Sequence, residues 1–437
     1  PAKAMTEPGN TGRAARALAP THPFPKAMAF GARTQSSLAA FQHAGFRNYW
    51  IALICTGFAV QIQTVAVGWQ VYDLTRNPFD LGLIGLSQFA PALLLVFVTG
   101  TVADRFSRRW IIGINLCVMA TGATGLLLLT TSGIPHVGFI FLLMAVFGTA
   151  RAFYNPAHQS IVPNLVPPNH LAQAIATTSS GAQISTICGP VAGGLLYGLS
   201  PNAAYGTSVT LFLTSALLML NLPKLAQNLS KRATNWETLS AGFRYIWTQK
   251  VILGAISLDL FAVILGGATA LLPVFARDVL DIGPTGLGFL RAGPGIGAII
   301  VGLYLMANPI TDHAGRAMFI AVAIFGVFTT VFALSETVWL SIAALIILGG
   351  ADIVSVFVRS TLIQLWTPDE LRGRVNAVNQ VFIGASNEVG AFRAGSLAAV
   401  MGPVTAVLIG GVGTLIVAGV WLRKFPELGR IKKLDGT

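Results

Sequence analysis

The chain has 437 residues, of which 54% are hydrophobic and only 10% are charged, and its mean hydropathy is +0.70. This balance excludes an ordinary water-soluble domain and predicts a protein that crosses a membrane many times. The net charge of +12 does not indicate a nucleic-acid-binding protein, because the basic residues are scattered over short segments between apolar stretches. They are better explained as topology signals and contacts to anionic lipid headgroups.

Residues 1–46 differ from the rest of the chain. They are rich in Pro, Ala, Gly, Thr and basic residues, and they contain no apolar run long enough to anchor in a bilayer. A signal peptide needs an apolar core behind its basic start, so none is predicted. We expect a disordered cytoplasmic tail.

Apolar stretches then follow one another almost to the end of the chain. A helical crossing of a bilayer core needs about 20 apolar residues, and such stretches begin near residues 50, 81, 111, 137, 172, 204, 251, 286, 318, 338, 375 and 404. The sequence therefore predicts an all-α membrane protein with twelve transmembrane helices.

The basic residues indicate how these helices are oriented. If the N-terminus is cytoplasmic, 22 of the 28 Lys and Arg residues fall in cytoplasmic segments, and only Arg76 and Arg277 fall in the outside loops. The positive-inside rule describes this kind of imbalance. We expect both termini in the cytoplasm.

The two halves of the chain repeat each other. Residues 47–222 and 249–424 each hold six apolar stretches, with a polar, basic cytoplasmic connector over 223–248 between them and a cytoplasmic tail over 425–437. A shift of 200 residues aligns LVPPNHL with LWTPDEL, and ADRFSRR resembles TDHAGR in the second half. Many secondary transporters are built from a duplicated six-helix unit. The predicted fold is two pseudo-symmetric six-helix bundles.

Charged residues within the apolar stretches avoid every third stretch. The third, sixth, ninth and twelfth contain no Asp, Glu, Lys or Arg. Because lipid cannot solvate an ionised group, membrane-embedded charges face protein or a wet cavity. We therefore expect the charge-free helices to be outermost. The candidates for proton coupling or buried ion pairs are the charged residues of the other stretches, namely Arg151, Asp259, Asp352, Arg359, Glu388 and Arg393.

Two roles are open for each of the three carboxylates. A carboxylate whose surroundings alternate between a dry pocket and a nearby arginine can load and release a proton. Alternatively, it forms a permanent ion pair that locks helices together. Asp352 is the first choice for the arginine-paired residue, because Arg359 lies two turns along the same helical face, with Arg151 as the other possible partner. Glu388 is the first choice for the proton site.

Polar and aromatic residues on the same stretches are candidates for lining a substrate cavity. They are Gln61, Gln63, Tyr154, Phe261 and Phe357. Aromatic rings bind aromatic or amphipathic solutes, although most rings in membrane helices only pack or lie at the interface.

Motifs for other functions are absent from the sequence. It has no G-x-x-x-x-G-K-[ST] loop for ATP, no H-E-x-x-H metal motif and no G-x-S-x-G nucleophile. Its three cysteines lie in apolar stretches and predict neither disulfides nor a metal site. We expect no enzyme, no cofactor and no metal.

Two motifs resemble the major facilitator superfamily of transporters. GTVADRFSRRW (100–110) is similar to its loop signature G-x-x-x-D-R-x-x-R-R. GPVAGG (189–194) is similar to the motif of its antiporters, with Ser185 in place of the leading glycine.

Longer stretches resemble the branch of enterobactin exporters and macrolide and multidrug efflux pumps. They are AFYNPAHQSIVPNLVP (152–167), TPDELRGRVNAVN (367–379) and GASNEVGAF (384–392). Where that branch has an acidic residue after GAF, this chain has Arg393.

The resemblance implies a conformational latch at one end of the protein. In the superfamily arrangement the loop carboxylate faces the start of the eleventh helix, and the contact opens when the halves rock apart. Its members here would be Gly100, Asp104, Arg105, Arg108, Arg109, Arg372 and Arg374. A helix-break motif at the seam between the halves would comprise Gly189, Pro190, Gly193 and Gly194.

The function implied is secondary active export across the bacterial inner membrane by alternating access. The protein would act as a monomer in the lipid bilayer and expel an amphipathic small molecule in exchange for protons. A siderophore-like molecule is the first choice and a macrolide or other drug the second. An uptake symporter and a non-transporting sensor or scaffold are the remaining alternatives.

Overall fold

The computed structural model describes residues 39–133, 136–223, 236–310 and 312–431. The regular secondary structure of these residues is helical, and none of them forms a strand. The predicted tail lies outside them over residues 1–38, but residues 39–46 form the helical turn η1 (Ala39–Gln42) and the start of the first helix. The folded protein thus begins earlier than the sequence predicted.

The first half forms seven α-helices, and α8 follows in the connector. They are α1 (Ala44–Thr75), α2 (Pro78–Leu94), α3 (Val96–Arg105), α4 (Arg108–Thr131), α5 (Val137–Ile161), α6 (Leu171–Leu199), α7 (Pro201–Leu220) and α8 (Trp236–Thr248), with the short 3-10 turns η2 (Val162–Asn164) and η3 (Pro168–His170) before α6.

The second half is less regular near its start. It comprises α9 (Lys250–Gly266), η4 (Thr269–Leu271), α10 (Leu272–Val274), the π-helical turn η5 (Phe275–Val279), α11 (Gly283–Ala307), α12 (Ala314–Leu334), α13 (Val338–Trp366), α14 (Asp369–Met401), α15 (Pro403–Lys424) and α16 (Pro426–Arg430).

Nine helices in the described part of the chain are long and apolar enough to cross a membrane. The predicted all-α membrane fold is confirmed, while the count of twelve crossings stays a prediction. The three predicted crossings that are not among these nine helices have visible causes in the sequence. The second predicted crossing is divided at Leu95 into α2 and α3, and α14 carries several charges. The sequence of α6 is rich in Ser, Thr and Gly. The helices α2, α6 and α14 lie at the seam between the halves, where polar residues are tolerated.

Local sequence explains why the chain turns where it does at one end of the molecule. Arg76 has φ 53°, which ends α1 in the left-handed region. Asn77 then accepts a hydrogen bond from the Phe79 N–H at 3.1 Å, and Pro78 occupies the first position of α2. Ser200 caps α7 in the same way.

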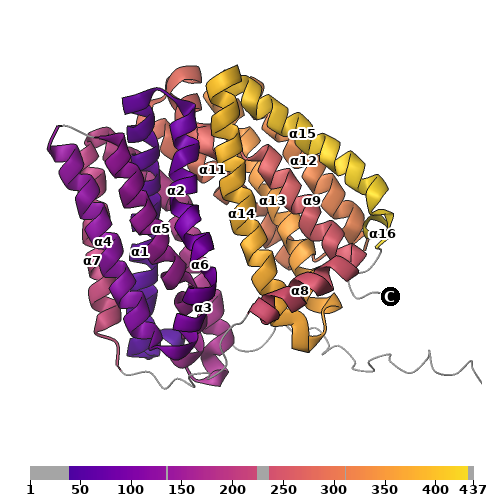
Figure 1. Ribbon diagram of the computed structural model, residues 1–437, viewed down its shortest axis with the longest axis horizontal. Helices are drawn as coiled ribbons and strands as arrows, with labels where there is room; N and C mark the ends of the chain where they lie inside the picture. The colour runs from indigo at the N-terminus through magenta and orange to yellow at the C-terminus, as the bar shows by residue number, and fades with distance from the viewer. Residues whose placement is uncertain (1–38, 134–135, 224–235, 311, 432–437) are drawn as a thin grey trace, which may run out of the picture.

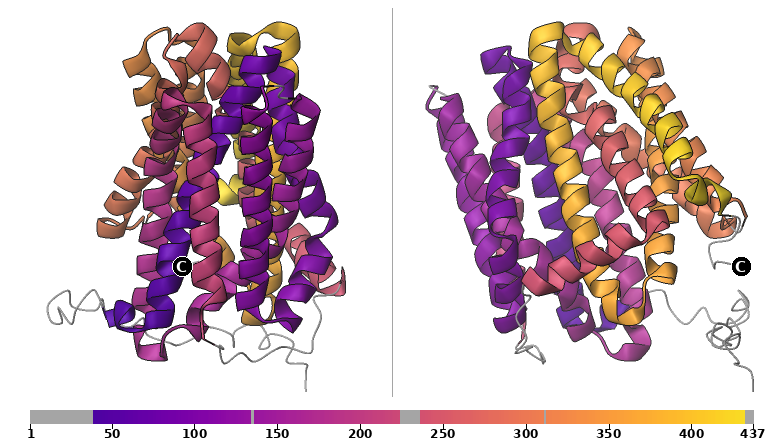
Figure 2. Two further views of the ribbon diagram at one scale, coloured as in Figure 1. Left: turned by 90° about the vertical axis from the view of Figure 1, so that its left-hand side faces the viewer. Right: turned by 45° about the vertical axis from the view of Figure 1, so that its right-hand side comes forward.

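The helices pack into two bundles. In the first, α1 packs on α6 and α7, and α4 packs on α5 and α7. In the second, α13 packs on α11 and α12, and α15 packs on α12 and α9. Figures 1 and 2 show the indigo-to-magenta helices on one side and the orange-to-yellow helices on the other.

Two helix pairs join the bundles: α2 packs along α14, and α6 packs along α11. We call the end where α1 begins and α8 lies the terminal end, and the end where α1 finishes and η5 lies the distal end. In Figure 1 the two groups of helices lie close together at the distal end, at the top, and diverge toward the terminal end.

Glycines make the close approach between the bundles possible. A Cβ atom on Gly288 of α11 would lie 2.6 Å from the Pro190 carbonyl oxygen and 3.3 Å from the Gly194 Cα of α6. A Cβ on Gly395 of α14 would lie 2.7 Å from the Pro78 carbonyl oxygen of α2. Small residues at these crossings let the two backbones touch, as is common in membrane proteins.

Gly288→Ala should therefore destabilise the protein. The added methyl group would meet the backbone of α6, which cannot yield without separating the helices, at a cost of about 1–3 kcal/mol. The matched control is Gly206→Ala on α7, where nothing lies within 4 Å of the new atom. Thermal unfolding of the two purified variants checks this, and equal melting temperatures would contradict it.

Candidate functional site

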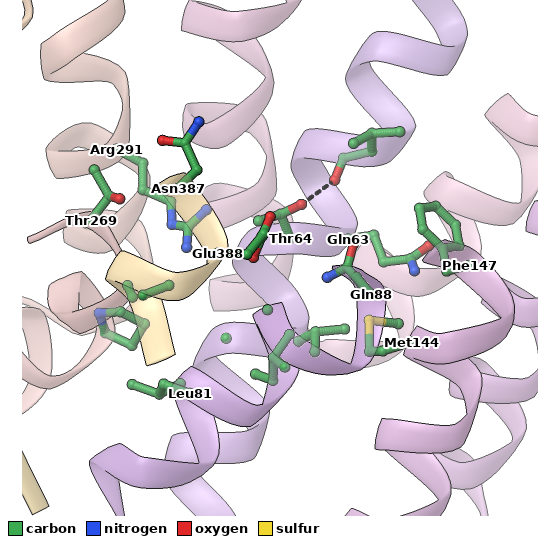
Figure 3. A pocket seen from close by; sticks show the side chains of 18 of the residues that line it. Gln63, Thr64, Leu81, Gln88, Met144, Phe147, Thr269, Arg291, Asn387 and Glu388 are labelled. Atoms are coloured by element: carbon green, nitrogen blue, oxygen red, sulfur yellow. Dashed lines mark hydrogen bonds between the residues drawn. The ribbon is translucent and has the colours of Figure 1, made fainter. Parts of the chain in front are cut away.

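A cavity of about 350 Å³ lies between the two bundles. Its walls come from α1, α2 and α5 of the first bundle and from η4, α10, α11 and α14 of the second (Figure 3). None of the lining residues belongs to α4, α7, α12 or α15, which contain the charge-free stretches. These four helices instead present large exposed apolar side chains, which suits contact with lipid.

The uncharged polar side chains of this cavity come from both bundles. Gln63, Thr64 and Gln88 belong to the first bundle, and Thr269 and Asn387 to the second. Apolar side chains complete the walls, among them those of Leu81, Met144 and Phe147. A small set of polar groups within apolar walls is typical of a site for a small molecule.

Three charged residues line the same cavity: Arg151 of α5, Arg291 of α11 and Glu388 of α14. Arg151 and Glu388 are near enough to attract each other. The Glu388 carboxylate also lies against Gly85 of α2, so it reaches across the seam to the first bundle. Within the described part of the chain, none of the three makes an ion pair within 4 Å.

Of the five residues predicted to line a substrate cavity, only Gln63 lines this one. Gln61 faces α6, where it packs against Gly189, and the ring of Tyr154 stacks on His158. The other two lie in the second bundle: Phe261 packs against Trp421 of α15, and Phe357 packs in the core. Helical position alone did not indicate which face of each helix meets the cavity.

The predicted pair of Asp352 with Arg359 is not formed. Arg359 of α13 instead donates to Asp259 of α9, and the Ser355 hydroxyl donates to the other oxygen of the Asp259 carboxylate at 3.3 Å. Residues seven apart are separated by about 10 Å along a helix, so a neighbouring helix supplies the closer partner. Asp352 faces a much smaller cavity beside Asp259.

Arg393 lies outside the central cavity and contacts the end of α9. It donates to the Leu265 carbonyl oxygen, one residue before α9 ends at Gly266. The last carbonyl groups of a helix lack partners within the helix, and a cation near them is favourable. This contact gives Arg393 a structural role and positions the break from which Thr269 reaches the cavity.

The motif predicted to break α6 leaves this helix continuous from Leu171 to Leu199, with Pro190 inside it. A membrane helix tolerates a proline when its neighbours satisfy the backbone. Instead, the glycines lack side chains and so let neighbouring helices approach α6 closely. Gly193 faces Ile62 of α1, and Gly194 faces Gly288 across the seam.

The predicted latch is not assembled by the side chains that the structure describes. The Asp104 side chain is outside them, so its contact with the start of α14 stays a prediction. Arg108 donates to the Ser160 carbonyl at 2.8 Å and to the Asn164 side chain at 2.7 Å, and Arg109 donates to the Leu222 carbonyl. All of these contacts fall within the first bundle.

The other latch candidates also contact their own half or lie at its surface. Arg372 forms an ion pair with Asp369 of the same helix, and the backbone of Arg374 lies against Gly242 of α8. Arg105 is exposed at the end of α3, while Gly100 is partly buried in the middle of that helix.

The distal end carries an ionic network that joins the bundles and that the sequence did not predict. Asp73 of α1 pairs with Arg277 of η5, and Arg76 lies 3.7 Å from Asp278. The Tyr72 hydroxyl donates to Asp278 as well. These reciprocal pairs use the two basic residues that the topology argument treated only as exceptions. They tie the end of α1 to η5 at the distal end.

Comparisons with known proteins identify the family. The model of the family described as "Transmembrane secretion effector" matches residues 35–435. The chain belongs to the major facilitator superfamily. Enterobactin exporters EntS from Escherichia coli O139:H28 and from Shigella boydii serotype 18 are each 27% identical to it over 402 residues, which cover 90% of this chain and 94% of theirs.

Solved structures show the same fold at low sequence identity. A mutant of the nucleoside transporter NupG has a TM-score of 0.72 at 14% identity and covers 87% of this chain and 100% of its own. A bacterial homologue of the iron transporter ferroportin in an inward-facing state has a TM-score of 0.68 at 12% identity, covering 89% and 99%.

The family decides the class of function. Members of the major facilitator superfamily are transporters, so the predicted fold class and the expectation that this chain is not an enzyme are confirmed. The chain is a multi-pass membrane transporter of a small molecule.

The distal network should control access to the cavity from that end. Asp73→Arg would place like charges together and separate α1 from η5, whereas Asp73→Arg with Arg277→Asp restores an attractive pair. In a cysteine-free background with Thr64→Cys as a reporter in the cavity, an impermeant maleimide added at the distal end should label the single variant several-fold faster than the parent or the exchanged pair. Equal rates in all three would contradict this.

Asp259→Asn should destabilise the protein much more than Asp352→Asn. The first change leaves Arg359, which is 3% exposed, without its anionic partner, at a cost of about 3–5 kcal/mol. The second removes no ion pair. Unfolding of the two variants in detergent checks the difference, and Asp352→Asn serves as the matched control. A larger loss for Asp352→Asn would contradict the observed pairing.

Proposed function

We propose that this transporter is a secondary active exporter that expels an amphipathic small molecule across the bacterial inner membrane in exchange for protons. The observation that carries the proposal is the central cavity, with polar groups from both bundles and one carboxylate at the seam between them. A site built from two bundles changes its exposure when the bundles rock against each other, as alternating access requires.

The terminal end is the cytoplasmic end in this proposal. The predicted cytoplasmic segments hold most of the basic residues, and α8 lies at that end. The ionic network between Asp73 and Arg277 then seals the cavity from the outside. A transporter in this state collects its substrate from the cytoplasm.

Glu388 is the proposed proton site. Its carboxylate belongs to α14 of the second bundle and lies against Gly85 of the first. Separation of α2 from α14 would change its distance from Arg151 and its access to water, and both change the affinity of a carboxylate for a proton. Asp259 is less suited to coupling, because Arg359 already holds it in a buried ion pair.

The substrate that we propose first is siderophore-like. The relatives named as enterobactin exporters match nearly the whole chain, but 27% identity is too low to transfer a substrate with the fold. A macrolide or other drug is therefore the second candidate. Uptake in symport with protons and a non-transporting role would each give a different result in the experiment below.

Everted membrane vesicles test this function. Vesicles with the protein should accumulate enterobactin, or failing that erythromycin, when respiration acidifies their interior, and an uncoupler should abolish the accumulation. Glu388→Gln should reduce proton-driven accumulation at least about tenfold, because the amide cannot release a proton. Glu336→Gln, in the exposed loop between α12 and α13, is the matched control.

The rival functions predict different outcomes. Accumulation of either compound only when the vesicle interior is more alkaline than the medium would indicate an uptake symporter. Accumulation of neither compound would remove both substrate candidates and favour a non-transporting role. Full activity of Glu388→Gln would remove Glu388 as the proton site.

A further inference from the structure

The central cavity contains more positive than negative charge. Its lining includes two arginines, Arg151 and Arg291, and a single acidic residue, Glu388. Arg151 has Glu388 as a nearby opposite charge. For Arg291, by contrast, the described residues offer no ion pair within 4 Å. Among the residues that the structure describes, one guanidinium charge in this cavity is therefore not balanced by an ion pair.

The placement of Arg291 suits contact with a bound molecule. The residue lies on α11 beside Pro294 within the helix, and a terminal nitrogen of its guanidinium reaches the neighbourhood of Gly68 on α1, on the opposite wall. In Figure 3 its side chain points into the cavity between Thr269 and Asn387.

Two polar atoms in this region are buried without a hydrogen-bond partner among the described residues. They are the Arg291 Nε, a donor, and the Gln63 Oε1, an acceptor. Gln63 is only 2% exposed. Leaving a buried polar group unpaired is costly, so such groups in a cavity indicate where a ligand or water makes its hydrogen bonds.

We propose that the cavity binds an organic anion, with an oxyanion of the ligand on Arg291 and a hydroxyl or N–H of the ligand donating to Gln63. Resonance-stabilised oxyanions such as carboxylates match the planar donor pattern of a guanidinium. The apolar body of the ligand packs on the wall formed by Leu81, Ile84 and Met144. The inference rests on the proposed function only in taking this cavity as the substrate site.

The same arrangement disfavours the opposite class of ligand. An amphipathic cation in this cavity would meet the unbalanced charge of Arg291 and would have to compete with Arg151 for Glu388. Like-charge contact in a partly dry cavity is strongly unfavourable. Among the drugs considered above, acidic ones thus fit better than basic ones.

Binding to the purified transporter in lipid nanodiscs tests the proposal without any transport. The probes share one ring system and differ in charge: 3-hydroxy-2-naphthoate, 3-hydroxy-2-naphthamide and 2-naphthylmethylammonium. Isothermal titration should show the carboxylate binding about tenfold tighter than the amide, as a charge-assisted hydrogen bond provides. The ammonium should bind most weakly.

Variants assign this preference to a residue. Arg291→Gln should reduce the carboxylate-to-amide ratio to near one, Arg291→Lys should keep part of it, and Arg244→Gln on the exposed face of α8 should leave it unchanged. Equal binding of the three probes, no binding by any of them, or an unchanged ratio in Arg291→Gln would overturn the proposal. Export itself is measured separately in vesicles. Export with a preference for cationic ligands would therefore overturn this inference and leave the proposed export function intact.

Discussion

The structure depends on one constraint: a bilayer solvates neither ionised side chains nor open backbone groups. The charged residues deep within the described membrane helices are consequently placed against protein or in the central cavity. Asp259 is neutralised by Arg359 inside the second bundle, and Arg393 satisfies the exposed end of α9. Arg151, Arg291 and Glu388 gather in the cavity between the bundles. The working cavity is where charges can be kept without lipid contact.

The same constraint explains which features could be predicted from sequence. The charge-free stretches were expected to face lipid, and the helices that contain them, α4, α7, α12 and α15, contribute nothing to the central cavity. The family was predictable because its loop motifs are local in sequence. The length of the apolar stretches therefore predicted the helical class, charge placement predicted the outer helices, and the motifs predicted the superfamily.

Pairing between helices was not predictable in this way. Asp352 shares a helical face with Arg359, but the nearest carboxylate to that guanidinium comes from α9, 100 residues earlier in the chain. Arg291 was visible in the sequence only as one more charge in an apolar stretch. The role that we propose for it depends on the lack, among the described residues, of an acidic partner within 4 Å, which is a property of the folded neighbourhood. The network of Asp73 and Arg277 likewise joins α1 to η5, which no local sequence pattern connects.

The two halves are duplicated in sequence but not in mechanical character. The first half opens with α1, an unbroken rod of 32 residues. Its counterpart opens with α9, then a gap at Gly267 and Ala268, then three short turns of different pitch that end in the π-helical η5. Segments of irregular pitch bend more easily than a continuous helix. The first bundle therefore begins with a stiff, continuous helix, whereas the second begins with a jointed segment beside the cavity and the distal ionic network. If the bundles rock against each other as proposed, the second bundle deforms more easily than the first.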